Sequence, residues 1–154
     1  MKYLLAIDIQ KEFAKGEAGE KIYQNCLKFI ADAKSNGYDE IIAAVYKQSE
    51  GFGNMDKLLD WHEMHEIAPL EFEPDRVCMH SGYQMRAFPD IHKNDEVHII
   101  GFDTDACVLA ACFDVFEIQC EMKILTDYIY SSGGLEMHMA GLKVLRRQFR
   151  KALV

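Results

Sequence analysis

The chain has 154 residues, of which 49% are hydrophobic and 27% charged, values typical of one folded domain that can bury a core. Its net charge of −8 argues against nucleic acid or an anionic membrane surface as a partner. No apolar run approaches the ~20 residues of a membrane span, and the N-terminus has no leader pattern. We therefore expect a single cytoplasmic domain over residues 1–154. The five cysteines are an odd number without regular spacing, which favours reduced thiols.

The chain alternates short apolar runs with segments whose apolar residues repeat at helical spacing. In chain order we predict strand 3–9, helix 18–36, strand 41–46, a short helix 54–62, strand 76–79, strand 97–100, helix 105–118, strand 122–125 and helix 135–150. Residues 152–154 are a candidate for a final edge strand. Because parallel strands need crossover connections, the alternation predicts an α/β fold: a three-layer α/β/α sandwich with a central parallel sheet of five or six strands.

Cys107 follows the strand 97–100 and a polar turn in which Thr104 or Asp105 is a plausible helix N-cap. A cysteine in a first helical turn lies beside unpaired N–H groups and the positive end of the helix dipole, which favour the reactive thiolate. The same N–H groups could receive a developing oxyanion. The alternative is that Cys107 is a buried small apolar residue like Cys112.

Asp8 interrupts the end of an otherwise apolar first strand. In open α/β sheets, functional groups gather beyond the carboxyl ends of the strands, so a carboxylate at this position is well placed for a site. The alternative is an ordinary turn or helix-capping aspartate.

Three stretches in the correct order resemble the isochorismatase-like cysteine hydrolases, the superfamily of nicotinamidases and N-carbamoylsarcosine amidohydrolase. GFDTDACV at 101–108 resembles the superfamily's G-x-x-T-D-x-C-V signature, and YLLAIDIQKEF at 3–13 its opening strand with D-x-Q-x-x-F. ILTDYIYSSGGLEMHMAGL at 124–142 resembles its fifth strand and last helix, with His138 and Ala140 in the usual H-x-A pattern. The resemblance spans nearly the whole chain.

The resemblance implies that Asp8 is the catalytic carboxylate and Cys107 the nucleophile. The superfamily's third catalytic residue is a lysine in a K-x-x-Y stretch after the third strand, and here that stretch reads His80-Ser81-Gly82-Tyr83. His80 is the natural replacement, because an imidazole can accept the thiol proton and the imidazolium can stabilise the thiolate. Asp8 would then orient His80 or act as the base itself. The alternative is an inactive site.

The resemblance also implies an oxyanion hole. Superfamily members hold a cis peptide just after the glycine of the signature, which falls at Phe102–Asp103 here. It would direct the Asp103 N–H toward the same point as the Cys107 N–H, provided that the Asp103 carboxylate points away. Phe13, Tyr83 and Trp61 would line the substrate pocket, which suggests a small planar or apolar substrate.

The predicted function is hydrolysis of a C–N bond in a small amide, imide or carbamoyl substrate through a Cys107 thioester. No cofactor and no metal are expected. A group of acidic and histidine residues could be mistaken for metal ligands, but a solvated surface explains it better. These residues are Asp60, His62, Glu63, His65 and Glu66.

Two other functions remain open: a catalytically impaired binding or assembly protein, and a redox sensor that uses Cys107. Vinyl ether hydrolysis of the isochorismate type is weaker, since superfamily members that catalyse it do not need the cysteine. The resemblance implies a homo-oligomer, either a dimer or a tetramer.

Overall fold

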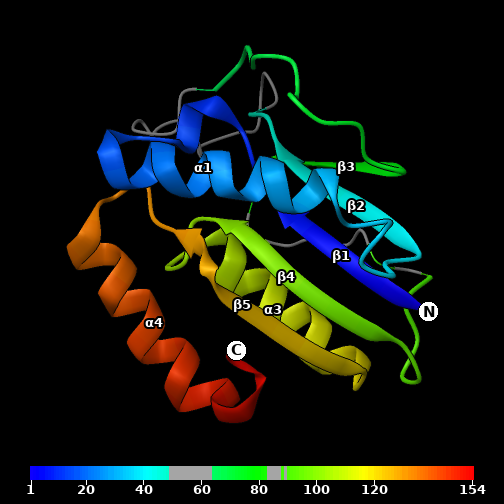
Figure 1. The fold of residues 1–154 in the computed structure, drawn as a ribbon. Helices are drawn as coiled ribbons and strands as arrows, with labels where there is room; N and C mark the ends of the chain where they lie inside the picture. The colour runs from blue at the N-terminus through cyan, green and yellow to red at the C-terminus, as the bar shows by residue number, and fades with distance from the viewer. Residues whose placement is uncertain (49–63, 83–87, 89) are drawn as a thin grey trace.

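A computed structural model describes residues 1–48, 64–82, 88 and 90–154. Five strands form one sheet in the order β3-β2-β1-β4-β5, and every neighbouring pair is parallel (Figure 1). The strands are β1 (Lys2–Ile7), β2 (Glu40–Tyr46), β3 (Arg76–His80), β4 (Glu96–Phe102) and β5 (Glu121–Tyr130). The predicted parallel sheet is thus confirmed with five strands.

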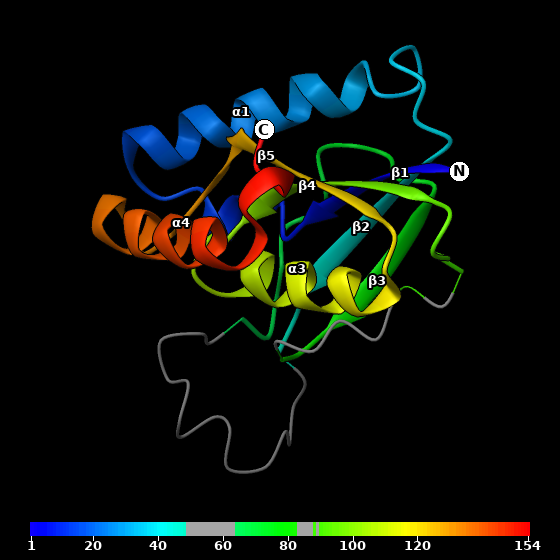
Figure 2. The same cartoon turned by 90° about the horizontal axis from the view of Figure 1, so that it is seen from below.

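Alternate residues of β1 are buried against helices on opposite faces of the sheet. Leu4 and Ala6 belong to a core that also contains apolar residues of α1 (Gly16–Ala31). Leu5 and Ile7 belong to a second core with α3 (Cys107–Ile118) and α4 (Leu135–Phe149). Because successive side chains of a strand point to opposite faces, a strand covered on both sides is a continuous apolar run. Figure 2 shows α1 above the sheet and α3 and α4 beneath it, which confirms the three-layer sandwich.

Several predicted boundaries differ from the structure. The strand predicted at 122–125 continues as β5 to Tyr130, because Ile129 and Tyr130 pair with the end of β4 beyond an irregularity in the register. The helix predicted at 18–36 is α1, which begins at Gly16 and ends at Ala31. Residues 150–152 form a 3-10 helix, and the candidate sixth strand is reduced to one bridge between Leu153 and Ile124. The helix predicted at 54–62 lies outside the described residues.

The connections leave a topological switch point beside β1. The chain adds β2 and β3 on one side of β1 and then β4 and β5 on the other, and open α/β sheets bind ligands beyond the strand ends at such a point. β4 comes very close to β1 here: a Cβ on Gly101 would lie 1.9 Å from the carbonyl oxygen of Ile7, and Gly101 has φ +124°. Only glycine permits this approach.

None of the five cysteines, all of which lie in the described residues, forms a disulfide, as their number and spacing predicted. Cys26, Cys107 and Cys112 are buried. Within the described part of the chain, no helix combines the length and the apolar character needed to cross a membrane.

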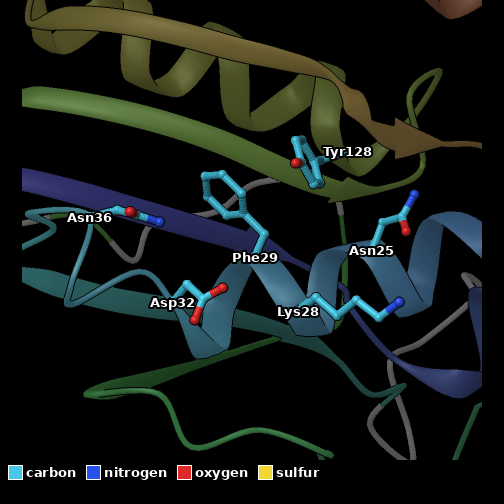
Figure 3. Close-up of a pocket in the computed structure, with 6 residues that line it drawn as sticks. All are labelled: Asn25, Lys28, Phe29, Asp32, Asn36 and Tyr128. Carbon is cyan, nitrogen blue, oxygen red and sulfur yellow. The ribbon is translucent and has the colours of Figure 1, made fainter.

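A surface hollow lies along α1 and the end of β5 (Figure 3). Its lining residues are Asn25, Lys28, Phe29, Asp32, Asn36 and Tyr128. Cys26 beneath it donates a hydrogen bond from Sγ to the Tyr128 carbonyl at 3.2 Å. None of the residues predicted for catalysis lines this hollow, so it is separate from the site described next.

Candidate active site

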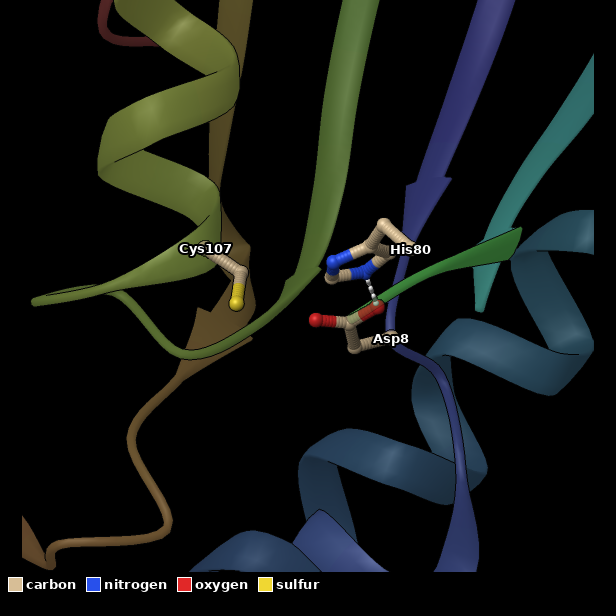
Figure 4. A group of neighbouring side chains, drawn as sticks. All are labelled: Asp8, His80 and Cys107. Carbon is tan, nitrogen blue, oxygen red and sulfur yellow. Dashed lines mark hydrogen bonds and ion pairs between the residues drawn. The ribbon is translucent and has the colours of Figure 1, made fainter. Parts of the chain in front are cut away.

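Asp8, His80 and Cys107 converge at the carboxyl end of the sheet (Figure 4). Asp8 follows β1, His80 is the last residue of β3, and Cys107 is the first residue of α3. His80 Nε2 lies 2.6 Å from Asp8 Oδ1, the Cys107 sulfur points toward the Asp8 carboxylate, and one ligand atom from each residue lies within 4.8 Å of the others. The structure therefore brings together the three side chains that the sequence analysis selected.

The backbone around Asp8 is fixed by β2. Asp8 has φ +47°, a left-handed conformation that aspartate tolerates better than most residues, and its N–H donates to the Ala44 carbonyl at 3.0 Å. The Gln10 side chain donates to the Tyr46 carbonyl at 3.0 Å and accepts from the Tyr46 N–H at 2.8 Å. Gln10 thus holds the end of β2 beside the segment that carries Asp8. This role of Gln10 is not apparent from the sequence, because it depends on the pairing of β1 with β2.

The contacts of His80 determine where its protons lie. Nδ1 is 2.7 Å from the Gly82 carbonyl oxygen, which can only accept, so Nδ1 carries a proton. Nε2 is 2.6 Å from Asp8 Oδ1, a distance that requires a second proton between the two atoms. The pair is therefore an imidazolium beside a carboxylate, or its tautomer with the proton on Asp8. Burial alone would lower the pKa of His80, but the bonds to Asp8 and Gly82 outweigh it and raise that pKa.

The electrostatics favour a neutral thiol at rest. Burial raises the pKa of Asp8 against the opposing effect of His80. Burial also raises the pKa of Cys107, and the negative charge of Asp8 raises it further. The expectation that the first helical turn makes Cys107 a thiolate is therefore wrong for the resting protein, because desolvation and a nearby carboxylate outweigh the helix dipole. The second carboxylate oxygen, Asp8 Oδ2, is buried without a hydrogen-bond partner in the described structure.

The turn before Cys107 is held by the loop that follows β5. Ser132 donates from both its N–H and its hydroxyl to the Asp103 carboxylate, each at 2.7 Å. Ser131 donates to Asp105 Oδ1 at 2.5 Å. The Asp103 carboxylate is thereby bound to the Ser132 side of the turn. The serines and glycines of residues 131–134 predict a turn, but this anchoring role is not apparent from the sequence.

Helix α4 supports the same turn from outside. Thr104 Oγ1 lies 2.8 Å from His138 Nδ1, so a hydrogen bond joins the turn to the first part of α4. A Cβ on Gly141 would lie 2.7 Å from the backbone of Thr104 and Asp105, which means that a glycine is needed for this close packing. The H-x-A-G stretch at 138–141 therefore positions the backbone that leads to Cys107.

Two backbone donors remain at the site. Among the described residues, neither the Asp103 N–H nor the Cys107 N–H has a hydrogen-bond acceptor. The Phe102–Asp103 peptide is cis, at the position that the resemblance indicated. Both N–H groups are thus available for another acceptor.

Comparison with known proteins adds a whole-chain observation. The model of the isochorismatase domain family matches residues 2–153. The chain belongs to the isochorismatase family. No curated protein matches it significantly.

The solved structures similar to this isochorismatase-family chain agree in fold at low sequence identity. A pyrazinamidase/nicotinamidase from Streptococcus mutans has a TM-score of 0.79 at 17% identity and covers 100% of both chains. A nicotinamidase from Bacillus subtilis has a TM-score of 0.75 at 18% identity, and the match covers 99% of this chain and 98% of that one. A pyrazinamidase from Pyrococcus horikoshii in complex with zinc has a TM-score of 0.73 at 18% identity, and the match covers 99% of this chain and 96% of that one. These TM-scores show a shared fold.

The predicted pocket residues are only partly described. Phe13 is buried and lies edge-on to Tyr46 with ring centroids 6.2 Å apart, and the Tyr46 ring is 5.5 Å from that of His80. Phe13 thus lies one aromatic ring away from His80. Tyr83 and Trp61 lie outside the described residues.

The acidic and histidine residues that were weighed as metal ligands are also only partly described. His65 and Glu66 are exposed. Asp60, His62 and Glu63 lie outside the described residues. The surface interpretation of this group therefore stays a prediction.

The buried carboxyl of Asp103 should make the stability of this isochorismatase-family domain depend on pH. Burial raises its pKa from 3.8 to about 6, against the opposing bonds from Ser132. The folded state therefore binds the proton more tightly than the unfolded state, and its stability falls as pH rises from about 4 to 6. Over this pH range, the free energy of unfolding of wild type should fall by about 3 kcal/mol more than that of Asp103→Asn. Urea unfolding at several pH values measures it, and parallel curves for the two proteins would contradict it.

Proposed function

We propose that this protein is a cysteine hydrolase that cleaves a C–N bond of a small amide, imide or carbamoyl compound. The observation that carries the proposal is the buried group of Asp8, His80 and Cys107 in a member of the isochorismatase family. The similar solved structures include nicotinamidases and pyrazinamidases, enzymes named for aromatic amides. Phe13 and the aromatic residues near it support a small planar substrate, with Tyr83 and Trp61 as further pocket residues.

In the first half of the proposed reaction, Asp8 is the general base. Its unpartnered Oδ2 takes the thiol proton while Cys107 Sγ bonds to the substrate carbonyl carbon. The raised pKa of Asp8 brings it closer to neutrality, where a carboxylate is a more effective base. The His80 imidazolium supplies the positive charge that the superfamily's lysine would hold. The free Asp103 and Cys107 N–H groups stabilise the oxyanion.

The second half returns the protons. Asp8 passes its proton to the leaving nitrogen, the C–N bond breaks, and an acyl thioester remains on Cys107. Asp8 then takes a proton from a water molecule whose oxygen attacks the thioester carbonyl. The C–S bond breaks, and the Cys107 sulfur recovers its proton from Asp8. His80 retains its proton throughout, so its role is electrostatic.

The environment of Cys107 argues against the redox-sensor alternative. Sensor cysteines have low pKa values and are accessible to oxidants, whereas Cys107 is 4% exposed and burial raises its pKa. A nucleophile that must stay reduced fits a reducing compartment, and we propose a cytoplasmic location on that ground.

A homo-oligomer, either a dimer or a tetramer, is also part of the proposal. Phe113 and Phe116 on α3 are 43% and 56% exposed, and Leu135 at the start of α4 is 65% exposed. Exposed apolar side chains on neighbouring helices are common at contacts between subunits. The partners proposed are thus a second copy of the chain and a small-molecule substrate.

Hydrolysis of a panel of small C–N compounds tests the proposed function, and mass spectrometry follows the products because ring opening of a cyclic imide releases no ammonia. The panel contains nicotinamide, pyrazinamide, cyclic imides and N-carbamoyl amino acids. Cys107→Ser should lower kcat for the best substrate at least about 10³-fold, because an alkoxide at this position is far harder to form than a thiolate. Cys112→Ser, on the same helix, is the matched control and should keep turnover.

Either of two results would reject the hydrolase. The first is that wild type turns over none of these compounds. The second is that Cys107→Ser turns over the best one at the wild-type rate. The first result would favour the binding or assembly protein.

A further inference from the structure

The candidate active site also has the composition of a transition-metal site. Asp8, His80 and Cys107 offer an oxygen, a nitrogen and a sulfur ligand, the three donor types that Zn²⁺ binds in proteins. The superfamily's lysine could not serve here, because a protonated amine has no lone pair. His80 therefore changes what the site can bind as well as how it holds charge. We propose that these three residues form a site for Zn²⁺, which blocks the nucleophile when it binds.

The distances require only a small adjustment. One ligand atom from each residue lies within 4.8 Å of the others, and Asp8 Oδ1 and His80 Nε2 are 2.6 Å apart. Tetrahedral zinc with bonds of 2.0–2.3 Å places its ligand atoms about 3.3–3.6 Å apart. The shared proton between Asp8 and His80 would leave, the pair would open by about 1 Å, and Cys107 Sγ would move closer by a similar distance.

The surroundings of the ligands fit a metal site. Gly82 accepts from His80 Nδ1 and leaves Nε2 directed at the site, as the outer hydrogen bond of a metal-binding histidine does. Asp8 is 0% exposed, yet its Oδ2 has no hydrogen-bond partner in the described structure. A buried polar atom without a partner is costly, and a cation would satisfy it.

The charge balance also permits zinc in this buried place. A thiol, a carboxylate and an imidazolium have no net charge. Zn²⁺ with a thiolate, a carboxylate and a neutral imidazole has none either, and two protons are released on binding. Three protein ligands leave a fourth position for water. The metal would hold the sulfur that the hydrolase needs, so zinc and acylation exclude each other.

Metal binding to the purified full-length protein tests this inference without any substrate. Zn²⁺ affinity is measured by competition with a fluorescent chelator, and Co²⁺ reports its ligands by the thiolate-to-cobalt charge-transfer absorption. We expect one ion per chain with a thiolate band in wild type and in the control Cys112→Ser. His80→Lys and Cys107→Ser should each weaken zinc at least about 100-fold, and circular dichroism checks that both variants fold.

Three results would overturn the zinc site. They are no zinc binding by wild type, a Co²⁺ complex without a thiolate band, and zinc binding by the two variants that is as tight as in wild type. In the last case a variant of His65 would show whether residues 60–66 hold the ion instead. Because every readout is metal occupancy, failure of the hydrolase proposal and failure of this one are separable.

Discussion

Replacing Asp8 with asparagine is expected to lower kcat for the best amide about 10²- to 10⁴-fold. The amide side chain keeps the size of the carboxylate but cannot take the thiol proton, and it cannot balance the His80 imidazolium. KM should change much less, because Asp8 acts on the nucleophile and on the leaving nitrogen. Steady-state kinetics of both proteins at neutral pH measure the effect.

Asp127→Asn is the matched control for this substitution. Asp127 is exposed near the end of β5 and makes no part of the site, so its variant should retain wild-type kinetics. Thermal unfolding of both variants separates loss of catalysis from loss of fold. An Asp8→Asn enzyme within tenfold of wild-type kcat would mean that another group moves the proton.

The second large effect concerns His80 and compares two substitutions. His80→Gln removes the positive charge and should lower kcat by about 10²-fold. His80→Lys restores a charge at the position where the superfamily carries its lysine, and it should retain at least about tenfold more activity than His80→Gln. The comparison tests whether the missing lysine has been replaced in function.

The pH profile gives the same comparison an independent readout. The pKa of His80 is raised by its bonds to Asp8 and Gly82, so the imidazolium persists to higher pH than in a free histidine and is lost as pH rises through that pKa. Wild-type kcat should therefore fall at alkaline pH. In His80→Lys this fall should move to higher pH, because the pKa of lysine is higher. Equal activity of His80→Gln and wild type, or the same alkaline fall in His80→Lys, would contradict the electrostatic role.

The fold was predictable because the strands can be recognised from their local apolar pattern. β1 and β4 are apolar on both faces, which indicates strands in a sheet covered on both sides. The full length of β5 was not predictable from local pattern, because Thr126 and Asp127 interrupt its apolar run and its last residues depend on pairing with β4. The final edge strand failed because Leu153 makes only a single bridge.

The site was predictable in its members and less so in its electrostatics. Asp8 and Cys107 were selected from strand ends and from the resemblance, and both lie where parallel strands end together. The burial of Cys107 and its contact with the Asp8 carboxylate depend on tertiary packing, so the raised pKa of Cys107 could not be read from its position in a helix. The proton arrangement of His80 likewise depends on the Gly82 carbonyl, which is placed by a turn.

The residues that hold the turn before Cys107 are visible in the sequence, but their role cannot be deduced from local pattern. Ser131 and Ser132 precede two glycines in a stretch that predicts a turn, and only the folded structure brings their hydroxyls to Asp105 and Asp103. Gly141 lies inside a helix, where glycine is unfavourable. Its close approach to the backbone of Thr104 gives the reason for it.

The most direct test of the covalent mechanism is to measure, by mass spectrometry, the mass of the peptide that contains Cys107 during turnover. The protein is mixed with its best amide, and separately with the aryl ester of the same acid, quenched in acid within the first turnovers and digested. A covalent mechanism predicts an acyl group on Cys107 and on none of the other four cysteines, and no acyl group on the Cys107→Ser protein. If both compounds are converted to product and neither leaves an acyl adduct on Cys107, the covalent mechanism is contradicted.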